Sequence, residues 1–85
     1  MITRLKEIPT TPTSVYGIVG LSQDTWDGIF FQALAANAET VRFGDPSIQP
    51  HELRPEANGY LPIKSSKSLV FVAPGTGNMV AFSFF

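Results

Sequence analysis

Short apolar runs separated by glycine and proline dominate the hydrophobic pattern of this chain. The runs are Val15–Leu21, Ile29–Ala35, Thr40–Phe43, Tyr60–Ile63, Leu69–Ala73 and Met79–Phe85. Runs of this length between turn residues are typical of strands in antiparallel sandwiches and small barrels. The sequence therefore predicts an all-β fold, a small antiparallel β-sandwich or barrel-like domain, with no helix longer than about two turns.

Residues 25–39 are the region where helix competes with strand. Alanine at positions 33, 35, 36 and 38 favours a helix, because alanine has the highest helix propensity. The apolar start Ile29-Phe30-Phe31 instead favours a strand that is covered on both faces. We expect a strand over Ile29–Ala35.

Two connections between the runs carry turn signals. Asn58-Gly59 predicts a tight turn, and Ser47–Asn58 reads as a long polar connection before it. Pro74–Asn78 predicts a hairpin loop between the last two strands. Its Gly75-Thr76-Gly77 lacks the third glycine and following helix of a dinucleotide-binding motif, so we interpret it as turn glycines.

The first fourteen residues differ from the rest of the chain. Ile2–Ile8 alternates only weakly, and Pro9 and Pro12 remove two backbone donors directly after it. With so few apolar residues the segment has little to bury by itself. We expect residues 1–14 to form an extended N-terminal arm that docks on a neighbouring subunit, and residues 15–85 to form a single β domain.

Composition indicates a protein that works by contact with another protein. The chain has 85 residues, a net charge of −1 and only 15% charged residues against 44% apolar ones. Such a balance lacks the basic face of a nucleic-acid-binding domain, and no apolar stretch is long and continuous enough for a membrane span. We expect neither nucleic acid nor membrane as a partner.

Residues with catalytic or metal-binding potential are few and scattered. The chain has no cysteine, and its one histidine, His51, lacks the second histidine of a zinc-protease helix. Asp24 and Asp27 flank Trp26, but calcium needs six to eight oxygens, so turn residues bonded to their own backbone explain the pair better. No G-x-S-x-G sequence is present. We expect no enzyme activity, no cofactor and no metal.

Four aromatic residues are candidates for an interface. Tyr16, Trp26 and Tyr60 belong to residue types enriched at protein interfaces, and together they could also form a sugar-stacking platform. In the last run, alternation places Val80, Phe82 and Phe84 on the core face and Phe85 on the mixed face. We expect another subunit to cover Phe85.

The order of motifs from Ile29 to Phe85 resembles a known class of proteins. The segments that carry the likeness are Gln32–Asp45 (QALAANAETVRFGD), Leu53–Ile63 (LRPEANGYLPI) and Leu69–Asn78 (LVFVAPGTGN), followed by the terminal apolar strand. This succession resembles the small β-sandwich virion proteins of tailed bacteriophages, often capsid decoration or cement proteins. The first 28 residues take no part in the resemblance, and the loop with His51 and its prolines departs from the pattern.

The resemblance implies a structural function. A protein of this class binds major capsid subunits on the capsid surface of the virion, stabilises the phage head and is made in the host cytoplasm. It also implies self-association, typically as a homotrimer. Other phage components of the tail or fibre share the same style of fold, and a small carbohydrate-binding β module is the further alternative.

Overall fold

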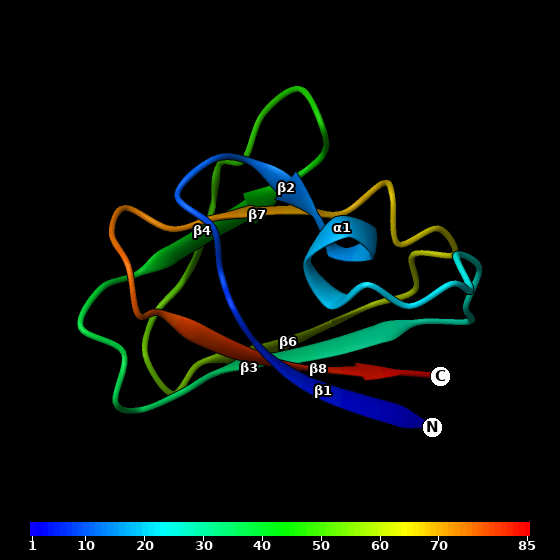
Figure 1. The fold of residues 1–85 in the computed structure, drawn as a ribbon, viewed down its shortest axis with the longest axis horizontal. Coiled ribbons are helices and arrows are strands. Elements are labelled where there is room, and N and C mark those ends of the chain that lie inside the picture. Colours follow the sequence, from blue (N-terminus) through cyan, green and yellow to red (C-terminus); the bar gives the residue numbers. More distant parts are fainter.

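The computed structural model, which describes all residues 1–85, is a sandwich of two four-stranded antiparallel sheets with one short helix (Figure 1). In chain order the elements are β1 (Ile2–Glu7), β2 (Thr13–Ser14), α1 (Val15–Val19), β3 (Ile29–Ala33), β4 (Val41–Gly44), β5 (His51–Leu53), β6 (Asn58–Leu61), β7 (Val70–Val72) and β8 (Met79–Phe84). The first sheet has the order β1-β8-β3-β6 and the second β2-β7-β4-β5. The predicted antiparallel β-sandwich is confirmed, and Ile29–Ala33 is a strand rather than part of a helix.

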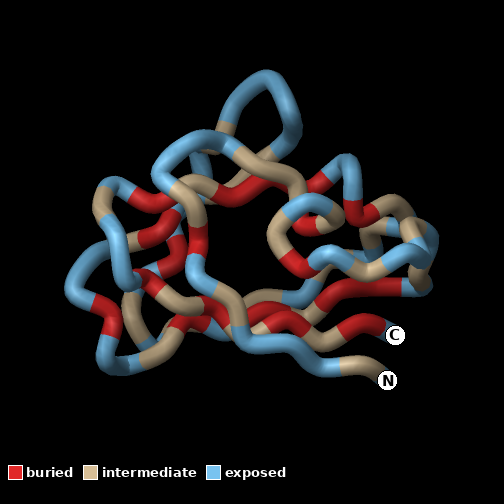
Figure 2. The backbone as a smooth tube through the Cα atoms, viewed as in Figure 1, coloured by how far each residue is buried: buried red, intermediate tan, exposed pale blue.

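The core lies between the two sheets, where the inner faces carry most of the buried residues (Figure 2). Along β8, Val80, Phe82 and Phe84 are buried, and the residues between them are partly exposed. This alternation is the one predicted from the sequence. Phe71 of the opposite sheet meets Phe82 and Phe31 edge to face, with ring centroids 5.2 and 5.3 Å apart.

The N-terminal segment is not an extended arm, which corrects the prediction for residues 1–14. β1 pairs with β8 along its whole length, from Ile2 opposite Phe84 to Glu7 opposite Met79. Ile8 is fully buried, and the chain then crosses to the second sheet, where β2 pairs with β7. β1 pairs with the side of β8 that β3 does not occupy. These backbone hydrogen bonds compensate for the weak apolar pattern of the segment.

Val15–Leu21 contains a helix, although its pattern predicted a strand. The Ser14 hydroxyl accepts a hydrogen bond from the Gly17 N–H at 3.2 Å and caps the start of α1. Gly20 ends the helix in the left-handed region at φ 75°. The helix buries Val15 and Val19, one turn apart, and lies against β1 and β2. No helix of the protein is long and apolar enough to span a membrane.

Gly59 is a strand residue and not part of a turn. It lies in β6 opposite Phe31, whose ring carbons would stand 2.8 Å from a side-chain β-carbon at position 59. Glycine is therefore required for close packing rather than for a tight turn. The polar connection predicted from Ser47 to Asn58 also contains a strand, because β5 pairs with β4.

The last two strands do not form a hairpin. β7 pairs with β2 and β4, whereas β8 pairs with β1 and β3, so Pro74–Asn78 crosses from one sheet to the other. Gly77 has φ 85°, in agreement with the turn predicted for this segment. The buried Asn78 side chain fixes the crossing, because its amide donates to the Gly75 carbonyl and the Glu39 carboxylate at 3.0 and 3.1 Å.

Candidate interaction surface

The outer face of the sheet β1-β8-β3-β6 is a continuous surface with almost no charge. Pairing register places one row of outward side chains from Leu5 on β1 to Asn58 on β6, and a second row from Thr3 to Tyr60. The outer face consists of Thr3, Leu5, Glu7, Phe30, Gln32, Asn58, Tyr60, Met79, Ala81 and Ser83, with Phe85 beside them. Glu7, at one end of β1, is its one ionisable carboxylate.

Tyr60 and Phe85 form an aromatic pair at one end of this face. Their ring centroids lie 6.2 Å apart, edge to face, and the two residues are 52% and 48% exposed. The Tyr60 ring extends over Gly28, where the backbone has no room for a side chain. The Gly28 carbonyl accepts the Phe85 N–H at 3.0 Å, and the Asp27 N–H donates to the Phe85 carbonyl at 2.6 Å. The terminal residue is therefore held by backbone bonds while its ring stays exposed.

The other two candidate aromatic residues lie elsewhere. Trp26 is partly buried and packs on Phe84, with centroids 5.0 Å apart. Tyr16 lies on α1, with the Lys67 ammonium 4.7 Å above its ring. Of the four residues predicted for an interface, the structure pairs the rings of Tyr60 and Phe85, and Phe85 also lines a pocket with Trp26. The structure adds Leu5 and Phe30 to the outer face, where the pairing register of the sheet places them.

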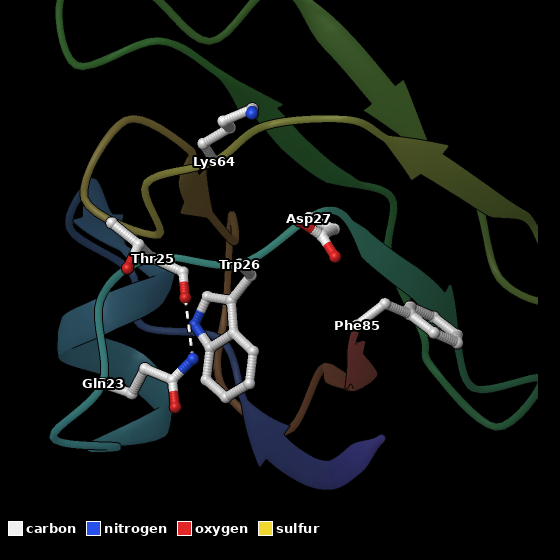
Figure 3. Close-up of a pocket in the computed structure, with 6 residues that line it drawn as sticks. All are labelled: Gln23, Thr25, Trp26, Asp27, Lys64 and Phe85. Carbon is white, nitrogen blue, oxygen red and sulfur yellow. Dashed lines mark hydrogen bonds between the residues drawn. The ribbon is translucent and has the colours of Figure 1, made fainter.

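Trp26 lines an open pocket of about 390 Å³ (Figure 3). The other lining residues are Gln23, Thr25, Asp27, Lys64 and Phe85. Figure 3 shows the Phe85 ring turned away from Trp26, while the Gln23 amide donates to the Thr25 carbonyl at 2.8 Å. The indole Nε1 is buried and has no acceptor in the chain. The ring that Trp26 contacts is Phe84, and neither Tyr16 nor Tyr60 lines its pocket.

The carboxylate of Asp24 tethers two loops. It accepts hydrogen bonds from the hydroxyls of Ser65 and Ser66 at 3.0 Å and from the Lys67 backbone N–H at 3.3 Å. Partial burial raises the pKa of Asp24, but these hydrogen bonds and the Lys67 charge outweigh it and hold the pKa below the ordinary value. The expectation that Asp24 bonds to its own turn is therefore wrong. No group of three or more histidine or acidic side chains lies together in the structure.

No known protein family, curated protein or solved structure matches the chain. The likeness to phage virion proteins consequently rests on the sequence pattern alone.

Proposed function

We propose that this protein is a structural binding protein that attaches to a partner protein through the outer face of the sheet β1-β8-β3-β6. The observation that carries the proposal is the exposed Tyr60–Phe85 pair, which backbone bonds and the contact with Gly28 hold in place. Rigid aromatic side chains lose little entropy on binding and are enriched among the residues that dominate interface energies.

The free edge of the same sheet supports binding through its face. On β1, Arg4 and Lys6 lie opposite Phe82 and Val80, so both cations are on the core-facing side of an edge strand. Inward-pointing charges on an edge strand disfavour pairing with another strand, which is a common protection against aggregation. The outer face of the sheet carries no such pair of cations.

The partner we propose is the major capsid protein of a tailed bacteriophage, because residues 29–85 resemble decoration proteins of such capsids. Bound to the capsid surface, with its own copies arranged around threefold positions, the protein stabilises the shell by adhesion and performs no reaction. Its low charge and many aromatic residues suit this function.

Replacing both Tyr60 and Phe85 with alanine should weaken capsid binding at least about tenfold, because two anchors of the interface are lost. Cosedimentation with shells of the phage that encodes the chain measures this effect. Tyr16→Ala is the matched control, since Tyr16 lies away from the outer face on α1. Unchanged binding by the double variant, or an equal loss with the control, would contradict the proposal.

One observation favours a second candidate function, the binding of a carbohydrate in the Trp26 pocket. The pocket combines an indole ring with polar side chains, and the indole N–H lacks an acceptor. Because the chain has a single tryptophan, its indole N–H gives one nuclear magnetic resonance signal that reports on the pocket. Titration with oligosaccharides should shift this signal if the pocket binds sugar. A signal that stays in place throughout a broad glycan panel rejects this function.

A further inference from the structure

The two sides of the sandwich are closed differently. On one side α1 lies against the edge strands β1 and β2. On the other side, between β6 and the β4–β5 pair, there is a pocket of about 410 Å³. This side pocket is lined by apolar residues and a few polar groups: Phe43, Leu61, Ile63, Leu69, Gly44, Asp45, His51 and Ser68. Its volume falls within the range of about 300–1,000 Å³ that is common for ligand pockets.

A loop beside the side pocket is held rigidly by its own hydrogen bonds. This finger, residues 45–50, projects from the top of the molecule in Figure 1 and is mostly exposed in Figure 2. The Asp45 carboxylate accepts bonds from the Ser47 hydroxyl and N–H at 2.6 and 2.8 Å and from the Ile48 N–H at 3.0 Å. These bonds hold the pKa of Asp45 below its ordinary value.

The base of the finger is fixed as well. The Arg42 guanidinium donates to the carbonyls of Gln49 and Pro50, each at 3.2 Å. Gly44 packs so closely against the Ile48 carbonyl and Pro50 that a larger residue would not fit. The loop therefore has one preferred shape before any partner arrives.

The finger presents a single exposed aliphatic side chain, that of Ile48. Ile48 is 60% exposed, and its side chain takes no part in the hydrophobic core. Ordering a flexible residue on binding costs conformational entropy, so a loop that is already ordered binds with a smaller entropy loss. A rigid loop with an exposed isoleucine is well suited to insertion into an apolar pocket.

We infer that Ile48 of one copy of this protein inserts into the side pocket of a second copy. Finger and pocket are neighbours, because Asp45 belongs to both and Gly44, which lines the pocket, directly precedes the finger. With a twofold axis beside them, the finger of each copy enters the side pocket of the other copy. Such an interface is isologous, because both copies use the same surface.

Charge supports a second copy as the occupant. The finger from Pro46 to Pro50 is uncharged, which complements the apolar part of the pocket. Only Asp45 and His51 among the pocket residues are titratable. A net charge of −1 per chain gives little repulsion between copies. The contact is separate from the outer face and goes beyond the proposed function.

Sedimentation equilibrium over concentrations from about 10 µM to 1 mM tests the inference, because this range covers weak self-association. The wild-type chain should pass from one chain to two. Ile48→Glu should raise the dissociation constant at least about tenfold by placing a charge at the apolar contact. Ser68→Arg should do the same from the other side, because a long side chain at this exposed position obstructs the pocket. Thr11→Glu, at an exposed position in the connection between β1 and β2, lies outside both the side pocket and the outer face and should leave self-association unchanged.

A mixture of the two variants provides the sharpest test. The Ser68→Arg chain keeps an intact finger and the Ile48→Glu chain keeps an intact pocket, so the mixture should associate more strongly than either variant alone. Circular dichroism confirms that both variants fold. A wild-type chain that stays monomeric at about 1 mM, variants that associate like wild type, or a mixture without gain would each overturn the inference. None of these results depends on capsid binding, so the proposed function is tested separately.

Discussion

Replacing Phe82 with alanine should lower the free energy of unfolding by about 3–5 kcal/mol, the usual cost of removing a buried phenylalanine side chain. Phe82 is fully buried on β8, which lies between β1 and β3. Its ring meets Phe71 at 5.2 Å and Phe84 at 6.4 Å, so truncation leaves a cavity between the sheets. Since a small domain has a total stability of about 5 kcal/mol, most of the stability would be lost.

Urea denaturation followed by circular dichroism measures this loss, with the slope of the transition as a check on two-state unfolding. Phe85→Ala is the matched control, because it removes the same side chain from the same end of the chain. Phe85 is about half exposed, so its truncation should cost no more than about 1 kcal/mol. Equal losses from both substitutions would show that Phe85 belongs to the core and would remove the basis for an interface there.

The strand β8 could be predicted from sequence because its signal is local. Val80, Phe82 and Phe84 alternate with smaller residues, and a period of two identifies both the strand and its buried face. Ile29–Ala33 could be predicted for a related reason, since β-branched and aromatic residues at its start outweigh the alanines that follow.

The elements that were predicted wrongly depend on contacts between distant residues. β1 has a weak pattern of its own and is held in place by pairing with β8 at the other end of the chain. The apolar run at Val15–Val19 favours a strand. It forms a helix instead, because Ser14 caps its start and the left-handed Gly20 ends it. Gly59 resembles a turn residue in sequence, but the ring of Phe31 requires it within a strand.

The candidate surface could be predicted only in part, because it too depends on contacts between residues that are distant in the sequence. Residue type indicates Tyr60, and the alternation of the last run indicates Phe85, but their contact arises because β6 and β8 both flank β3. Leu5 and Phe30 join the surface through register, which sequence alone does not show. The finger was read as part of a polar connection, because the bonds that order it run between side chains and backbone within the loop.

Removing residues 1–8 should abolish cooperative folding. If the segment were an extended arm, the same deletion would leave the domain folded. The deletion removes β1 and leaves one edge of β8 without its backbone partner. It also removes Ile8, which is fully buried and whose N–H donates to the Asn78 carbonyl at 2.8 Å. Loss of a buried isoleucine side chain alone costs about 2–5 kcal/mol, close to the whole stability of a domain of this size.

Thermal denaturation and the dispersion of amide signals in a nuclear magnetic resonance spectrum measure the effect of the deletion. Leu5→Ala is the control for the strand itself, because the Leu5 side chain is 51% exposed while its backbone pairing with Ala81 is unaffected. This variant should keep the fold and lose no more than about 1 kcal/mol. A deleted chain with a wild-type melting temperature would show that the seven remaining strands suffice and that β1 is only docked on them. Loss of the sharp transition would instead show that the sandwich closes only when the two ends of the chain pair, because β8 is the centre of the first sheet only while β1 lies beside it.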